Sequence, residues 1–97
     1  MNRVVVTGLG TINPCGNNAE DTWKSVCEGR SGIGVISAFD ATDWPVQIAG
    51  EVKGWAPATA LDRKAVKRMD RFMQFALVAS LEAVADAGLE VGDDGLG

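Results

Sequence analysis

The two cysteines, Cys15 and Cys27, are the natural candidates for a nucleophile in this 97-residue sequence, which contains no histidine. A reactive cysteine needs a nearby histidine, a cation or a helix N-terminus to favour its thiolate. Cys27 falls in the last turn of an expected helix, where the helix dipole disfavours an anion, and no cation or histidine lies near Cys15 in the sequence. We therefore interpret Cys27 as a small core residue and predict no catalytic residue in this chain.

Residue counts and spacing also bear on metals and cofactors. Two cysteines without a histidine cannot supply the four ligands of an ordinary zinc site, so no metal site is expected. Gly8-Leu9-Gly10 follows an apolar run and invites comparison with the dinucleotide fingerprint G-x-G-x-x-G, but the sixth position is Asn13 and Pro14 delays the next helix. A tight turn after a strand explains these glycines better. No cofactor is predicted, and a nucleotide-binding module remains a remote alternative.

A cluster of cations points weakly to a local anionic partner. The chain carries a net charge of −4, yet five of its nine cations fall within nine residues, namely Arg63, Lys64, Lys67, Arg68 and Arg71. Lys64, Lys67 and Arg68 are spaced i, i+3 and i+4, so a helix would place them on one face. This face is either an ordinary solvated surface or a dock for an acidic protein or a phosphate group. The overall acidity argues against nucleic acid as the main partner.

The elements that would position these residues follow from local patterns. Arg3–Thr7 contains three consecutive valines, which is typical of a strand buried on both faces. Asn18 predicts the start of a helix and Gly29 its end, with Ala19, Trp23, Val26 and Cys27 on one buried face. Residues 30–45 are expected to be irregular. Val46, Ile48 and Val52 alternate with polar residues and predict a half-buried strand.

The segment from Asp62 to Ala87 predicts two helices. Asp62 is expected to cap a short basic helix, Asp70 a longer one from Arg71, and Gly88 to end it. The longer helix has an apolar face rich in alanine, made of Phe72, Phe75, Ala76, Ala79, Ala83 and Ala87, which would allow another backbone to approach closely. Further apolar residues cover much of its remaining surface, so this long helix is expected to be buried on more than one side. The predicted order of strand, helix, strand, helix and helix cannot shield this surface, so we expect further chain or a partner to complete the core.

Length and composition limit the remaining possibilities. A chain of 97 residues allows one small domain at most, and 46% hydrophobic with 23% charged residues is typical of a folded soluble protein. No apolar run reaches the roughly 18 residues that a membrane span requires. The N-terminus lacks the core and cleavage site of a signal peptide. We therefore expect a cytoplasmic protein with free cysteines and no membrane partner.

A series of short motifs, in this order, resembles the N-terminus of the β-ketoacyl-acyl-carrier-protein synthases, most closely the synthase II type. The motifs are VVVTGLG at residues 4–10, Pro14-x-Gly16-Asn17, Thr22-Trp23-Lys24, Gly29-x-Ser31-Gly32-Ile33, Phe39-Asp40, Ala49-Gly50-x-Val52 and the basic block from Arg63 to Gln74. Each motif is weak alone, whereas their joint order is specific. They cover nearly the whole chain, which corresponds to roughly the first quarter of such an enzyme.

The resemblance implies an α/β fold, namely an incomplete N-terminal portion of a thiolase-like domain over residues 1–97. It implies an acyltransferase of fatty-acid or polyketide biosynthesis that is homodimeric when complete. The family's nucleophilic cysteine motif and its two catalytic histidines have no counterpart here, so the isolated chain is expected to be inactive. Lys64, Lys67 and Arg68 match positions that help to bind acyl carrier protein in the family. The alternative is a non-enzymatic chain that binds carrier protein or folds only with a partner.

Overall fold

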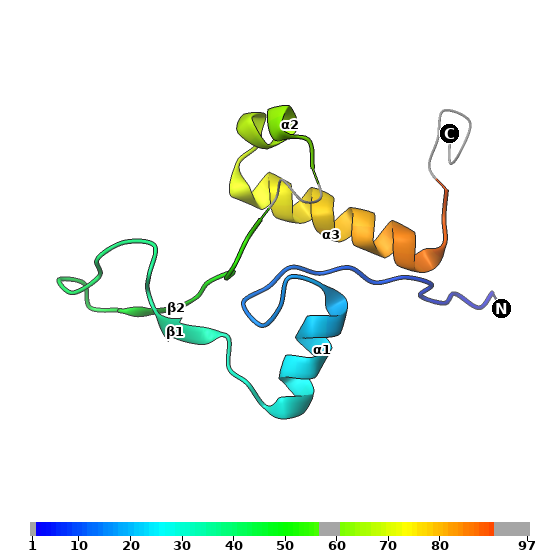
Figure 1. The fold of residues 1–97 in the computed structure, drawn as a ribbon. Helices are drawn as coiled ribbons and strands as arrows, with labels where there is room; N and C mark the ends of the chain where they lie inside the picture. Colours follow the sequence, from blue (N-terminus) through cyan, green and yellow to red (C-terminus); the bar gives the residue numbers. More distant parts are fainter. Residues whose placement is uncertain (1, 57–60, 91–97) are drawn as a thin grey trace. The chain divides into compact units, whose positions relative to one another are not determined.

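The computed structural model describes residues 2–56 and 61–90, which belong to two compact units. One unit contains Met1–Thr11 with Ala56–Gly97, and the other contains Ile12–Trp55. The elements follow in the order α1 (Ala19–Glu28), β1 (Ile33–Val35), β2 (Ile48–Gly50), α2 (Arg63–Arg68) and α3 (Arg71–Ala87), as Figure 1 shows. Within the described ranges, no helix is both long enough and apolar enough to cross a membrane.

Helix α1 begins and ends where the sequence predicts. The Asn18 side chain accepts a hydrogen bond from the Asp21 N–H at 2.8 Å, and Gly29 adopts the left-handed conformation with φ 70°. The expected burial of its apolar face is wrong, because Trp23 is 67% exposed and Val26 is 56% exposed. The side that α1 does bury carries Ser25, whose hydroxyl donates to the Cys15 carbonyl at 2.8 Å. A short polar residue therefore fastens α1 to the loop before it.

A two-stranded antiparallel hairpin completes this unit. Strand β1 pairs with β2 in the register Ile33↔Gly50, Gly34↔Ala49 and Val35↔Ile48. Residues 33–35 are expected from the sequence to be irregular, and that prediction is wrong because these residues pair with β2 as a strand. The second strand is confirmed, but it is limited to Ile48–Gly50. Its expected buried side is wrong, because Val46 and Ile48 are both exposed. A Cβ at position 50 would come within 2.9 Å of Pro14 Cγ, so close packing accounts for Gly50 in the strand.

Glu51, which directly follows β2, holds the loop that follows β1. Its carboxylate accepts hydrogen bonds from the Ser37 N–H at 3.0 Å, the Ser37 hydroxyl at 2.9 Å and the Ala38 N–H at 3.0 Å. The bonds from the Ser37 backbone and side chain lower the pKa of Glu51 below its ordinary value of 4.5. Since the folded pKa is depressed, the charged carboxylate stabilises the loop above the unfolded pKa. That stabilisation is lost as the pH falls through the folded pKa.

In a complete synthase that carries this segment, an NMR titration of the Glu51 carboxyl should therefore give a midpoint below pH 4.5, and the Ser37 and Ala38 amide shifts should titrate with the same midpoint. The variant Glu51→Gln keeps one acceptor oxygen but cannot ionise, so the titration of both amides should disappear. Amides that follow a midpoint at or above the ordinary glutamate value would contradict the bonding seen here.

The N-terminal segment of the other unit is extended but is not a strand. Val4, Val5 and Val6 are 92%, 70% and 78% exposed, and no described residue pairs with them in a sheet. The predicted strand over Arg3–Thr7 is therefore wrong for this structure. A strand exists only when a neighbouring strand pairs with its N–H and C=O groups, and the described part of the chain supplies none here.

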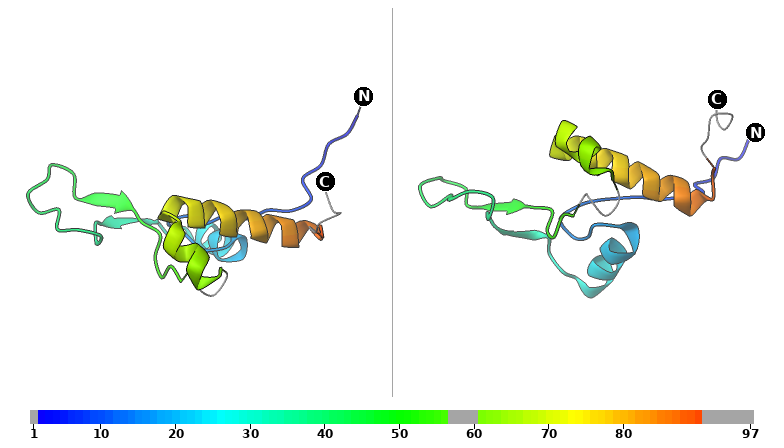
Figure 2. Two further views of the ribbon diagram at one scale, coloured as in Figure 1. Left: turned by 90° about the horizontal axis from the view of Figure 1, so that it is seen from above. Right: turned by 45° about the horizontal axis from the view of Figure 1, so that its top comes forward.

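Helix α3 lies beside this extended segment, as Figures 1 and 2 show. A Cβ at Gly8 would come within 2.6 Å of Ala87 N, and a Cβ at Gly10 would come within 2.7 Å of Ala83 N. The predicted close approach of a second backbone to the alanine-rich face is thus confirmed, and that backbone belongs to the same chain. The glycines do not form the tight turn expected there. A turn at Asn13–Gly16, closed by Asn13 N–H to Gly16 O at 2.9 Å, follows instead.

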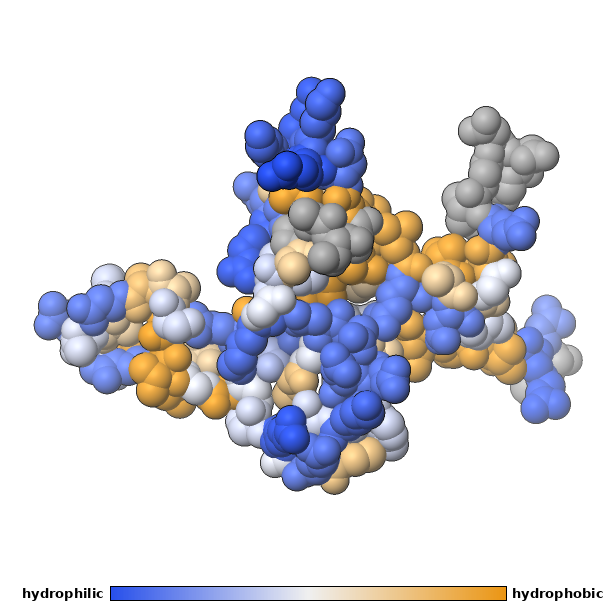
Figure 3. Space-filling model, in the orientation of Figure 1, coloured by the Kyte–Doolittle hydropathy of each residue, from blue (hydrophilic) through white to orange (hydrophobic). Residues whose placement is uncertain are grey.

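The starts of α2 and α3 and the end of α3 lie at the predicted residues. Asp62 and Asp70 occupy the N-cap positions, although neither side chain makes a capping hydrogen bond, so that detail of the prediction is wrong. Gly88 ends α3 in the left-handed conformation with φ 73°. The expected burial of α3 is wrong for this structure, because much of its apolar surface is exposed, with Phe72 69% and Leu81 48% accessible. Figure 3 shows hydrophobic residues along α3 and hydrophilic residues over α2.

Candidate functional site

Helix α2 presents the predicted cationic face. Lys64, Lys67 and Arg68 are all exposed, while Ala65 and Val66 are half-buried. Their i, i+3 and i+4 spacing on a regular helix brings the three cations onto one side. Lys67 and Arg68 also lie in the last turn, where the negative end of the helix dipole favours positive charge. We call Lys64, Lys67 and Arg68 the cationic face below.

The amide of Gln74 fastens the end of α2 to α3. Gln74 is 7% exposed, and its Nε2 donates to the Val66 carbonyl at 3.3 Å and to the Met69 carbonyl at 3.0 Å. These carbonyls lie at the end of α2, where an α-helix leaves its last carbonyls without their usual partners four residues on, and the Val66 carbonyl also accepts the Met69 N–H at 3.3 Å. Gln74 therefore positions the helix that carries the cationic face. The sequence analysis missed this role, although a polar residue among the apolar residues of a helix was a visible signal.

The cationic face makes no ion pair with any described residue. Within residues 2–56 and 61–90, salt bridges join Lys24 to Glu20 and Arg30 to Glu28, both in the other unit. The fifth cation of the basic cluster is used differently, because the Arg71 guanidinium lies 5.3 Å from the centre of the Phe75 ring. The cationic face thus keeps its charge available to an anionic partner. Its assignment to partner binding stays a prediction.

The backbone around Gly8-Leu9-Gly10 does not offer a phosphate site. The N–H groups of Leu9 and Thr11 donate to the carboxylates of Asp86 and Glu82. A dinucleotide site uses such N–H groups at a helix N-terminus for its pyrophosphate, whereas here two negative charges occupy that region. The geometry gives no support to the nucleotide-binding alternative.

The two cysteines lie in unremarkable surroundings. Cys15 is half-buried in the turn before α1, where its N–H donates to the Asn13 side-chain oxygen at 2.8 Å. Cys27 is exposed, so its assignment to the core is wrong within this structure, because nothing described covers the face of α1 on which it lies. In the part of the chain that the structure describes, no group of three or more His, Cys, Asp or Glu residues could hold a metal ion.

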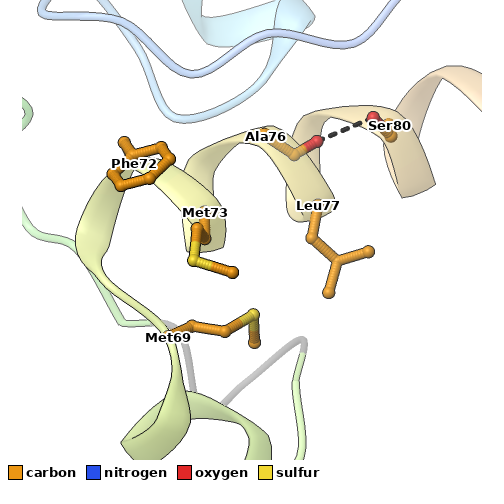
Figure 4. Close-up of a pocket in the computed structure, with 6 residues that line it drawn as sticks. All are labelled: Met69, Phe72, Met73, Ala76, Leu77 and Ser80. Atoms are coloured by element: carbon orange, nitrogen blue, oxygen red, sulfur yellow. Dashed lines mark hydrogen bonds between the residues drawn. The ribbon is translucent and has the colours of Figure 1, made fainter.

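An open apolar groove of about 440 Å³ lies along α3, lined by Met69, Phe72, Met73, Ala76, Leu77 and Ser80. Met73 and Leu77 extend from α3 toward Met69, and the Ser80 hydroxyl donates back to the Ala76 carbonyl at 2.7 Å (Figure 4). The lining offers no acid, base or cation that could act on a substrate. The groove is therefore a packing surface rather than a reactive centre.

Comparison with known proteins agrees with this arrangement. Residues 1–95 match the family model described as "Beta-ketoacyl synthase, N-terminal domain". The 3-oxoacyl-[acyl-carrier-protein] synthase 2 of Synechocystis is 52% identical over 94% of this chain, and that of Coxiella burnetii is 44% identical over the same share. A solved structure, the ishigamide ketosynthase/chain length factor, superposes with a TM-score of 0.78 and 34% identity over 89% of this chain.

These matches establish first the fold, which is the incomplete N-terminal portion of a thiolase-like α/β domain. The chain belongs to the β-ketoacyl synthase family. It spans about a fifth of its relatives' length, since the aligned part covers 22% of each synthase and 21% of the ketosynthase structure. The resemblance drawn from the sequence motifs is confirmed.

Proposed function

We propose that these residues form the N-terminal part of a β-ketoacyl-acyl-carrier-protein synthase whose cationic face binds acyl carrier protein. Such an enzyme transfers an acyl group to a cysteine and then condenses it with malonyl-carrier protein. Loss of CO₂ generates a carbanion that attacks the acyl thioester, so a carbon–carbon bond forms and the enzyme thiolate leaves. The proposal includes a cytoplasmic homodimer in fatty-acid or polyketide biosynthesis and treats residues 1–97 as part of one synthase domain.

The unpaired cationic face carries the docking part of this proposal. Lys64, Lys67 and Arg68 are exposed on a helix whose end Gln74 holds in place, and no described carboxylate neutralises them. Carrier proteins are acidic, and complementary charges at the rim of an interface mainly speed association. The curated relatives named above carry acyl-carrier-protein in their names, which agrees with this partner.

Charge reversal at Lys64 and Lys67 should weaken carrier binding in a complete synthase that carries this segment. With Lys64→Glu and Lys67→Glu, the KM for acyl-carrier protein should rise about tenfold at low salt, equivalent to ~1.4 kcal/mol. The increase should shrink in high salt, because the screening length falls to roughly 3 Å at 1 M. Turnover of a small acyl thioester without carrier protein should stay near that of the unsubstituted enzyme.

Two matched variants separate docking from other effects. Lys24→Glu with Arg30→Glu makes the same change in net charge on exposed residues of the other unit and should leave the KM unchanged. Lys64→Arg with Lys67→Arg keeps the charge and should retain binding. If charge reversal leaves the KM for carrier protein unchanged, the cationic face is only a solvated helix surface. Equal losses on both substrates would indicate damage to the fold.

A further inference from the structure

Two acidic side chains of α3 bind the backbone of the N-terminal segment. Asp86 Oδ2 accepts a hydrogen bond from the Leu9 N–H at 3.0 Å, and Glu82 Oε1 accepts one from the Thr11 N–H at 2.9 Å. The partner on α3 moves toward the helix N-terminus as the segment proceeds, so the two backbones run in opposite directions. Gly8 and Gly10 pack on the same helix at Ala79, Ala83 and Ala87.

The spacing of the acceptors matches the spacing of the donors. Glu82 and Asp86 lie four residues apart, which is about 6 Å along an α-helix. Leu9 and Thr11 lie two residues apart, which is about 6.6 Å along an extended chain, with both N–H groups on one edge. The distance between the two carboxylates along α3 is therefore close to the distance between the two N–H groups along the segment. Both pairs can form together only in one alignment of the two backbones.

The position of Asp86 is unfavourable for the helix itself. It lies in the last turn of α3, where the helix dipole disfavours a carboxylate, and α3 has no basic residue in that turn and no acidic residue in its first turn. Asp86 is thus placed against the local preference of the helix. A residue that breaks such a preference indicates a requirement elsewhere, and the Leu9 N–H supplies one, because hydrogen bonds to a charged acceptor are the stronger kind.

We infer that Glu82 and Asp86 form a register lock, by which we mean a carboxylate pair that fixes the alignment of residues 8–11 along α3. The glycines and the lock have separate tasks. Gly8 and Gly10 leave space for the approach, but a glycine adds no attractive group of its own. The carboxylates supply the attraction, and the two act on different amides. Loss of one carboxylate should therefore release one amide and not the other.

Site-resolved hydrogen exchange in a complete synthase that carries this segment tests the lock. Asp86→Ala should accelerate exchange at the Leu9 amide tenfold or more with a much smaller effect at Thr11, and Glu82→Ala should do the reverse. Asp86→Asn and Glu82→Gln keep an acceptor oxygen and should give intermediate effects without loss of the fold. The Ile36 amide, bonded to the Gln47 carbonyl at 2.9 Å in the other unit, is the reference and should not change.

Asp86→Lys gives opposite results under the two explanations. A lysine in the last turn improves the interaction with the helix dipole, so a residue that served only the helix surface would slow exchange nearby or leave it unaltered. If Asp86 locks the register, the same variant accelerates exchange at Leu9. Unchanged or slower exchange at Leu9 would overturn the inference. An equal acceleration at Leu9, Thr11 and Ile36 would also overturn it, because it would show general destabilisation.

Discussion

Replacing Gly10 with alanine is expected to destabilise the protein by about 3 kcal/mol, because the new methyl group would overlap the backbone of α3. The added Cβ would lie against the Ala79 carbonyl oxygen, and 2.7 Å from Ala83 N and 3.0 Å from Ala79 C. These atoms belong to a hydrogen-bonded helix and cannot turn aside as a flexible side chain would. The segment would have to move away, and the hydrogen bond from Thr11 to Glu82 would be lost with it.

The cause of this effect is space and not backbone conformation. The described glycines with positive φ are Gly29, Gly54 and Gly88, and Gly10 is not among them. Alanine at position 10 would therefore restrict the unfolded chain, which by itself stabilises a protein by about 0.4–1 kcal/mol. The predicted loss is what remains after this gain is subtracted from the costs of overlap and of the broken hydrogen bond.

Gly34→Ala is the matched control. Gly34 lies in β1, its φ is not positive, and an added Cβ would meet no atom within 4 Å. Its melting temperature in a complete synthase should stay at or slightly above that of the unsubstituted protein, whereas that of Gly10→Ala should fall clearly. Equal melting temperatures for the two variants would show that the segment can leave α3 without loss.

The helix ends were predictable from the sequence because their causes are local. Asn18, Gly29 and Gly88 act on backbone groups within a few residues, so each carries its own signal. The valine-rich strand failed for the opposite reason, since pairing depends on a partner elsewhere in the chain. Strand β1 was missed because three residues are too few for a clear alternation.

The same difference between local and distant causes decides which residues of the candidate site could be predicted. Charge and helical spacing were enough to select Lys64, Lys67 and Arg68, because both can be read from neighbouring residues. The role of Gln74 depends on carbonyls five and eight residues earlier, at the end of a different helix. The contacts of Leu9 with Asp86 and of Thr11 with Glu82 span 77 and 71 residues, and no local pattern reports them. The resemblance to the synthase family could supply the fold but not these bonds.

The 97-residue chain, prepared alone, is expected to bind a hydrophobic dye strongly and to unfold without a sharp transition. Large apolar side chains project from both units, with Trp23 67%, Phe72 69%, Met73 43% and Leu77 40% exposed. Of the hydrophobic residues that the structure describes, Ala41 alone is buried, with 6% of its surface exposed. A stable domain needs a core that offsets the entropy lost on folding, and one buried alanine supplies very little.

The chain's place in its family explains the exposure. Because the aligned residues cover 22% of the curated relatives, the surfaces of α1 and α3 correspond to a small part of a much larger domain. Exposed apolar surface of this extent leads to dye binding and self-association. Dye fluorescence, calorimetry and gel filtration of the isolated chain test this directly, with a complete synthase carrying the same segment as the reference. A monomer that melts cooperatively and shows slowly exchanging amides in α3 would contradict the expectation, because it would mean that α2, α3 and the N-terminal segment suffice as a core.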